Sequence, residues 1–126
     1  MVPEQAERQA GHGLLNKGMI SGTTALVALL GQPVSHSLSP VMQNAALKAM
    51  GLDWSFLALP CSADDLATVL KGLEAVGCRG LNVTIPHKQA VSLLCDELSP
   101  LAQRLGAVNT MIPLPNGGWQ GHNTDV

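Results

Sequence analysis

Short apolar runs alternate with amphipathic segments along most of this chain. Residues 24–31 (TALVALLG) are continuously apolar and end in Gly31-Gln32-Pro33, which is typical of a strand buried on both faces. The tripeptide Asn116-Gly117-Gly118 is a turn signal that joins the last two apolar runs into a hairpin. The predicted strands are residues 24–31, 54–60, 80–85, 107–115 and 118–124.

Helical periodicity fills the stretches between these strands. Ser39 and Ser99 stand where a capping hydroxyl is expected, and each is followed by proline at the first helical position. The predicted helices are residues 39–51, 62–77, 86–98 and 99–106. The side chains expected to face the core are Val41, Ala45, Leu47 and Met50 in the first helix, and Leu66, Val69, Leu70 and Leu73 in the second.

Strands that alternate with helices predict an α/β fold. We expect a mostly parallel sheet flanked by helices on both faces, with an antiparallel edge hairpin near the C-terminus. Residues 1–22 lack periodicity and predict a flexible leader, so the folded domain is expected to span residues 23–126. In such sheets ligands bind beyond the carboxyl ends of the strands, which is where candidate site residues should lie.

Composition excludes several classes of partner. The net charge is -2 and aromatic residues are 2% of the chain, so neither a basic stripe nor a stacking platform for nucleic acid is present. No apolar run approaches the roughly 18 residues of a membrane-spanning helix. Cysteines 61, 78 and 95 and the histidines lack metal-ligand spacing, so we predict no metal site and a cytoplasmic protein with reduced thiols.

Hydroxyl and amide side chains gather where several predicted strands begin or end. They are Ser37 and Ser39 after the first strand, Asn82 and Thr84 in the third, and Asn109 in the fourth. Such groups each donate and accept hydrogen bonds, which suits a small polyol or hydroxy acid. Lys88 and Asp125 are the charged candidates for proton transfer with such a ligand.

Each candidate also has a purely structural alternative. Ser39 could act only as a helix cap, whereas Ser37 has no capping role to explain it. Asn82 and Thr84 could satisfy backbone groups at the end of a strand. A helix dipole disfavours a cation in the first turn, so Lys88 needs an anionic substrate or an acidic partner there.

Four segments in register resemble the amino-terminal half of shikimate dehydrogenase: GQPVSHSLSPVMQNAAL, GLNVTIPHK, GAVNT and GHNTDV, within residues 31–126. The resemblance implies the substrate-binding domain of an enzyme that interconverts 3-dehydroshikimate and shikimate with NADPH, in aromatic amino-acid biosynthesis. It also implies a role for each candidate. Ser37 and Ser39 would hold the substrate carboxylate; Asn82, Thr84, Asn109 and Asp125 would bind hydroxyls; Lys88 would be the acid/base, working with Asp125.

The chain departs from the family pattern in two places. Gln43-Asn44 stands where the family often has His-Asn, at positions expected on a helix and outside the pocket. The glycine-rich phosphate loop should follow the Asn-Thr-Asp segment, so NADP would be bound by a C-terminal domain that this chain lacks. We therefore expect the chain alone to be inactive. A quinate/shikimate dehydrogenase, a non-catalytic polyol-binding or dimerisation module, and a homodimer are open alternatives.

Overall fold

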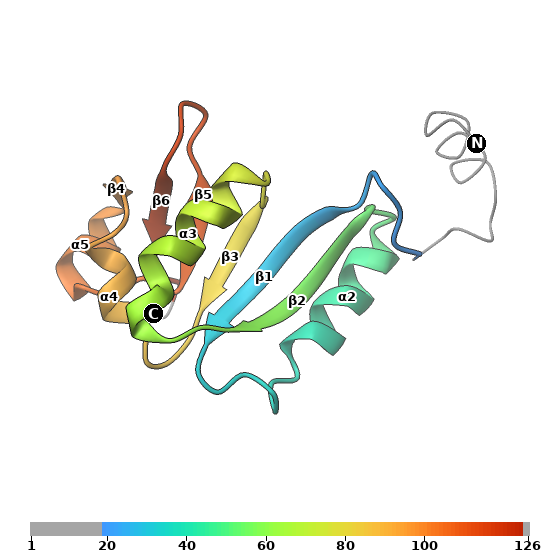
Figure 1. The fold of residues 1–126 in the computed structure, drawn as a ribbon, viewed down its shortest axis with the longest axis horizontal. Coiled ribbons are helices and arrows are strands. Elements are labelled where there is room, and N and C mark those ends of the chain that lie inside the picture. Colours follow the sequence, from blue (N-terminus) through green and yellow to red (C-terminus); the bar gives the residue numbers. More distant parts are fainter. Residues whose placement is uncertain (1–18, 125–126) are drawn as a thin grey trace.

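One mixed sheet organises the computed structural model, which describes residues 19–124 (Figure 1). Its strands are β1 (Ala25–Gly31), β2 (Trp54–Pro60), β3 (Gly80–Val83), β4 (Glu97–Leu98), β5 (Thr110–Pro113) and β6 (Trp119–His122). The helices are α2 (Ser39–Ala49), α3 (Leu66–Ala75) after the 3-10 turn η2 (Ala63–Asp65), α4 (Lys88–Ser92) and α5 (Pro100–Leu105). This architecture confirms the predicted α/β class.

The strand directions bring several chain segments to one edge of the sheet. Within the order β2-β1-β3-β5-β6-β4, strands β1, β2 and β3 are parallel, while β5 is antiparallel to both β3 and β6. Strands β1, β2, β3 and β6 therefore end, and β5 begins, on the same side. We call this side the carboxyl edge. It is the side on which parallel sheets bind ligands.

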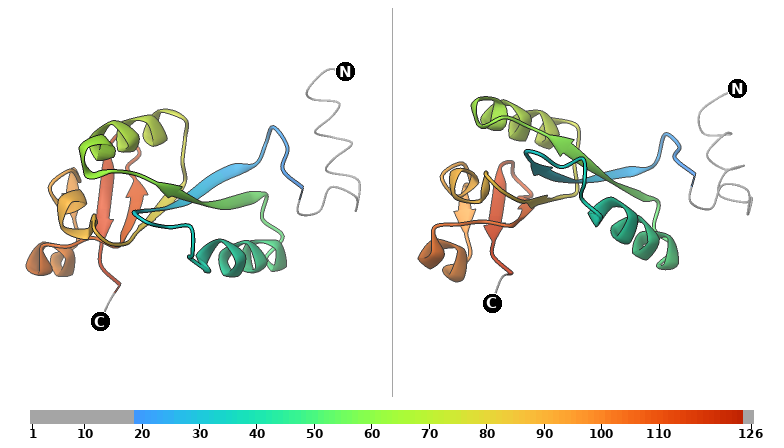
Figure 2. Two further views of the ribbon diagram at one scale, coloured as in Figure 1. Left: turned by 60° about the horizontal axis from the view of Figure 1, so that its bottom comes forward. Right: turned by 90° about the horizontal axis from the view of Figure 1, so that it is seen from below.

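The two faces of the sheet carry different helices (Figure 2). Helices α3, α4 and α5 lie over one face, where Leu66, Val91 and Ala102 join a large buried core with strand residues such as Leu81 and Met111. Helix α2 lies over the other face and beside β2. In the part of the chain that the structure describes, the buried cluster on this face consists of Leu29, Val34, Leu47 and Phe56, with the partly buried Val27, Trp54 and Ala58 packed against it.

The prediction for α2 was wrong about the side that faces the core. Among its apolar residues Leu47 is buried, whereas Val41 is 71% exposed, Met50 is 64% exposed and Ala45 is also exposed. In α3 the prediction was better, because Leu66, Leu70 and Leu73 are buried and Val69 packs against the core. Helix α2 buries fewer apolar side chains than α3 because, on its side of the sheet, it packs only against β1 and β2.

The predicted helix over residues 86–98 is also wrong in extent. Helix α4 covers only Lys88–Ser92, and residues 97–98 form β4, parallel to β6 at the edge of the sheet. Hydrogen bonds from Asp96 N to Trp119 O (2.9 Å) and from Ser99 N to Gly121 O (2.9 Å) hold this segment along β6. Pairing with a neighbouring strand thus replaces the helical bonds that local periodicity suggested.

Of the predicted leader, residues 1–18 lie outside the described part of the chain. Residues 21–24 form a turn in which Ser21 N donates to Thr24 Oγ1 at 2.9 Å. Thr24 Oγ1 in turn donates to Asp53 Oδ1 at 2.7 Å, just before β2. These bonds fix the entry into β1 against the start of its neighbour.

Candidate functional site

Backbone hydrogen bonds link the loops of the carboxyl edge to one another. Gln32 N, after β1, donates to Ile85 O, after β3, at 3.1 Å. Val83 N donates to Asn109 O (2.8 Å), and Asn109 N donates to His122 O at the end of β6 (3.0 Å). The loops that carry the predicted site residues are therefore tied into one row across the sheet.

The two serines precede and open α2, but their roles differ from the prediction. Ser39 is the first residue of the helix, Leu38 occupies the cap position, and no side chain caps it. Ser37 Oγ instead accepts the Ser39 N–H at 3.1 Å. Ser39 as a helix cap was therefore wrong, and Ser37 is the serine that satisfies a helix amide. Both side chains are half-buried.

Asn82 and Thr84 lie along the α2 face of the sheet. Asn82 is paired with Thr110 of β5, and both line a hollow of about 190 Å³ together with Gln43 of α2. Gln43 lies on a helix, as expected; because the hollow also reaches Arg79 and Gly80 at the start of β3, it does not test whether Gln43 lies outside the substrate pocket. Thr84 lies one residue beyond β3, where its N–H donates to Leu30 O at 2.9 Å. Within residues 19–124 its hydroxyl makes no hydrogen bond, so it can serve a ligand.

Lys88 opens α4 at the same edge and is half-buried. Its carbonyl accepts from Val108 N at 2.8 Å, which ties the start of the helix to the segment before β5. The neighbouring His87 is fully buried and its Nε2–H donates to the Cys61 carbonyl. His87 thus packs in the interior and links the start of α4 to the end of β2.

Asn109 is 8% exposed and is committed to its neighbours. Its Nδ2 donates to Thr124 Oγ1 at 3.0 Å, and its Oδ1 accepts from Thr124 N at 3.1 Å and from Thr110 Oγ1 at 3.0 Å. Asp125 itself lies outside the described residues. The Asn109 amide therefore fixes the backbone that leads directly to Asp125. Thr124 lies in the GHNTDV segment, but its bonds to Asn109 were not predicted.

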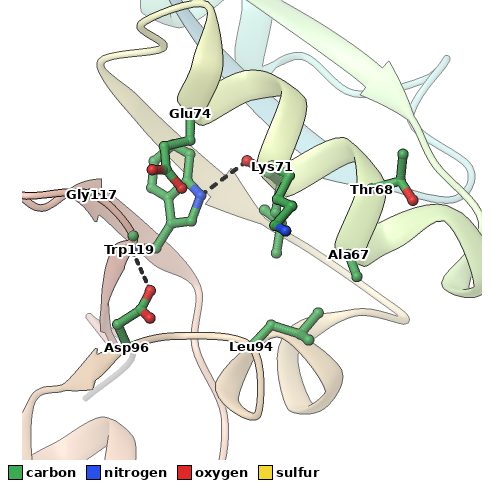
Figure 3. A pocket seen from close by; sticks show the side chains of 10 residues that line it. Ala67, Thr68, Lys71, Glu74, Leu94, Asp96, Gly117 and Trp119 are labelled. Carbon is green, nitrogen blue, oxygen red and sulfur yellow. Dashed lines mark hydrogen bonds between the residues drawn. The ribbon is translucent and has the colours of Figure 1, made fainter.

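A larger pocket of about 470 Å³ lies at the opposite edge of the sheet (Figure 3). It lies between α3, the segment before β4 and the β5–β6 turn, and its lining includes Lys71, Glu74 and Leu94. Trp119 forms one wall, held by bonds from its Nε1 to Leu70 O (3.1 Å) and from its N to Asp96 Oδ2 (2.9 Å). No predicted site residue lines this pocket, so size alone does not identify the site.

The thiols of the described residues are unsuited to nucleophilic chemistry. Cys61, Cys78 and Cys95 are free, and burial raises the pKa of each. For Cys95, burial and then the nearby Asp96 charge raise the pKa to about 11. A thiol with a raised pKa is a poor source of thiolate near neutral pH. Over residues 19–124 there is no group of three His, Cys, Asp or Glu residues arranged to hold a metal ion.

A dinucleotide would find little to bind in the described residues. Amides in the three strand-to-helix connections at the carboxyl edge have internal partners: Ser39 N donates to Ser37 Oγ, Asp65 N donates to Ser62 O (3.2 Å) and His87 N donates to Thr84 O (3.0 Å). A pyrophosphate needs such amides at the start of a helix, together with a glycine-rich turn. Residues 19–124 therefore do not fit NADP. In the same part of the chain no helix is long and apolar enough to cross a membrane.

Comparison with known proteins places these features in context. The family model described as "Shikimate dehydrogenase substrate binding domain" matches residues 29–111. A shikimate dehydrogenase (NADP(+)) of a Synechococcus species is 54% identical over 109 residues, which are 86% of this chain and 38% of that protein. The chain thus spans well under half the length of this curated relative.

Solved structures give the same picture. A crystal structure of a shikimate dehydrogenase in complex with NADP+ superposes with a TM-score of 0.82 at 43% identity, over 85% of this chain and 37% of the other. The shikimate 5-dehydrogenase of Listeria monocytogenes, in complex with shikimate and NAD, superposes with a TM-score of 0.81 at 41% identity, with the same coverage.

Proposed function

Because this chain belongs to the shikimate dehydrogenase substrate-binding domain family, we propose that its carboxyl edge binds shikimate and 3-dehydroshikimate during their NADP-dependent interconversion. The observation that carries this proposal is the linked row of loops at that edge. It brings Ser37, Thr84, Lys88 and Asn109, which are far apart in sequence, to one side of the sheet. A cyclic polyol acid needs such a row, because its hydroxyls and carboxylate point in several directions.

The proposed contacts follow the chemistry of each side chain. Ser37 and Ser39 bind the substrate carboxylate; since Ser37 Oγ accepts from Ser39 N, its own O–H proton stays available for donation. The substrate hydroxyls are bound by Asn82, Thr84, Asn109 and Asp125. For Asn109 the proposal includes a second role, because its bonds to Thr124 fix the approach to Asp125.

Proton transfer is the chemical step that this chain would perform. Reduction of the ketone leaves an alkoxide that must gain a proton, and oxidation of the alcohol requires the reverse. Lys88 acts as this acid and base, and Asp125 holds its ammonium group in place. NADP supplies or accepts the hydride and would be held by residues other than 19–124.

Binding by the chain itself tests the proposal directly. Titrating the 15N-labelled protein with shikimate should shift amide signals around Ser37, Thr84, Lys88 and Asn109 and leave the pocket around Lys71 unchanged. Quinate, added in a parallel titration, measures the preference for a related polyol acid. Shifts confined to the opposite edge, or no shifts at millimolar shikimate, would contradict the proposal.

Turnover tests the role of Lys88 in a protein that joins this domain to the NADP-binding domain of a relative. Lys88→Ala should lower kcat about a hundred- to ten-thousand-fold, the usual contribution of a positioned acid, with a smaller change in KM. Lys48→Ala is the matched control, because Lys48 lies exposed in the last turn of α2. A raised KM with intact kcat would make Lys88 a binding residue instead.

Three further parts of the proposal concern the setting of this domain. We infer a division into a leader of residues 1–22 and a substrate-binding domain of residues 23–126, which contains the matched region 29–111. The three free cysteines support a cytoplasmic location.

The exposed apolar side chains of α2, including Val41 and Met42, support a homodimer. Sedimentation of the protein at several concentrations tests the last point.

A further inference from the structure

Gly31 ends β1 in a space too small for any side chain. A Cβ atom built on Gly31 would lie 2.4 Å from Thr84 Cγ2, 3.0 Å from Val34 Cγ1 and 3.1 Å from Ile85 O. Gly31 is not among the glycines with a positive φ, so its backbone conformation is open to alanine. Glycine is therefore required at position 31 because there is no room for a side chain. The atom nearest to an added Cβ is the methyl carbon of Thr84, a residue that is proposed to bind the substrate.

Thr84 has little freedom to move away from Gly31. Its N–H donates to Leu30 O at 2.9 Å and its carbonyl accepts from His87 N at 3.0 Å. The next residue, Ile85, is held by the bond from Gln32 N at 3.1 Å. With the backbone fixed on both sides, a methyl group at position 31 would force Thr84 to rotate about χ1. A threonine has few χ1 rotamers, and each places the hydroxyl in a different direction.

We propose that Gly31 is a positioning residue for substrate binding: its missing side chain selects the Thr84 rotamer whose methyl group faces Gly31, and so sets the direction of the Thr84 hydroxyl. This inference rests on the proposed function, in which that hydroxyl binds the substrate. Gly31, at the end of β1, would thus influence substrate recognition without touching the substrate.

A pair of substitutions separates this idea from a general loss of packing. Gly31→Ala should weaken shikimate binding about three- to tenfold, the range expected when one hydrogen bond is lost. Thr84→Ser keeps the hydroxyl and removes the methyl group that the new Cβ would strike. The double variant Gly31→Ala/Thr84→Ser should therefore recover most of the affinity of Thr84→Ser alone.

A control variant separates an effect on stability from an effect on binding. Gly80→Ala is the matched glycine variant, because a Cβ at this strand position would meet its nearest atom, Met111 O, at an ordinary 3.7 Å. It should leave both binding and the urea midpoint of unfolding unchanged. Gly31→Ala should lower the urea midpoint, and the double variant should restore most of that loss.

The outcomes are distinct. Wild-type affinity in Gly31→Ala, or a double variant that binds and folds no better than Gly31→Ala, would overturn the positioning role while leaving the proposed function intact. Absence of shikimate binding by the unmodified chain would overturn the proposed function, and the positioning role with it. Rescue of the urea midpoint without rescue of binding would show that Thr84 and Gly31 only pack together, and would also overturn the inference.

Discussion

The two faces of the sheet are stabilised in different ways. On the face covered by α3, α4 and α5, apolar side chains from every helix enter one core, and Leu66 is 1% exposed. On the other face α2 contributes Leu47, while Val41 and Met42 of the same helix are 71% and 68% exposed. Helix α2 is less apolar than α3 and packs against β1 and β2 alone, so fewer of its apolar side chains are buried.

Helix α2 is attached to the sheet by a polar contact as well as by packing. Asn44 Nδ2 donates to Phe56 O at 2.9 Å, and Phe56 N donates to Asn44 Oδ1 at 2.8 Å. Phe56 lies in β2, an edge strand whose outer backbone groups would otherwise have no strand to pair with. The amide thus takes the place of a neighbouring strand at this residue and helps to hold the helix where little apolar surface is buried.

The largest expected effect comes from truncating one apolar residue on each face. Leu66→Ala should cost about 2–5 kcal/mol of unfolding free energy, because it leaves a cavity in the larger core. Val41→Ala should change it by less than about 0.5 kcal/mol at concentrations where the protein is monomeric, since the side chain is then exposed. Leu47→Ala, the matched variant within α2, should fall between the two. Urea titrations compare all three, and a large loss for Val41→Ala would show that α2 is covered in solution.

This contrast shows which parts of the fold the sequence could predict. Periodicity identified α3 correctly because its apolar stripe does face a core. It failed for α2 because periodicity shows only which residues of a helix are apolar. How many of them are buried depends on the area of sheet beneath the helix, and that area depends on the order of the strands. The two-residue strand β4 was missed for the same reason, since its partner β6 is distant in sequence.

The candidate site shows the same division. The position of Ser37, Thr84, Lys88 and Asn109 at the carboxyl edge could be predicted, because strand ends and helix starts follow from local signals; their part in binding stays a prediction. The contacts of Ser37, Asn109 and Gly31 could not be predicted, because each is made across the fold or around a helix start: Ser37 with the Ser39 amide, Asn109 with Thr124, and Gly31 beside Thr84.

A smaller effect should follow from breaking the polar contact of α2. Asn44→Ala leaves both Phe56 backbone groups without this partner and should cost about 1–3 kcal/mol. Gln43→Ala, one residue earlier, is the control for the loss of a polar side chain on the same helix and should cost less. Thermal and urea unfolding measure the difference. Equal losses in the two variants would show that the Asn44 contact contributes little.

The smallest expected effects compare the helix starts on the two faces. Ser99 is a true cap of α5, since its Oγ accepts from Ala102 N at 3.1 Å, and Ser99→Ala should cost about 1 kcal/mol. Ser39 has no such bond at the start of α2, so Ser39→Ala should change the unfolding free energy by less than about 0.5 kcal/mol. Ser37→Ala removes the acceptor for Ser39 N and should cost more than Ser39→Ala, although both serines are proposed to bind the substrate carboxylate. Urea titrations without ligand measure the effect of each substitution on the unfolding free energy alone, and shikimate titrations of the same variants then measure binding. If Ser39→Ala lowered stability as much as Ser99→Ala, the cap of α2 would be Ser39 after all, and the division of roles between the two serines would be wrong.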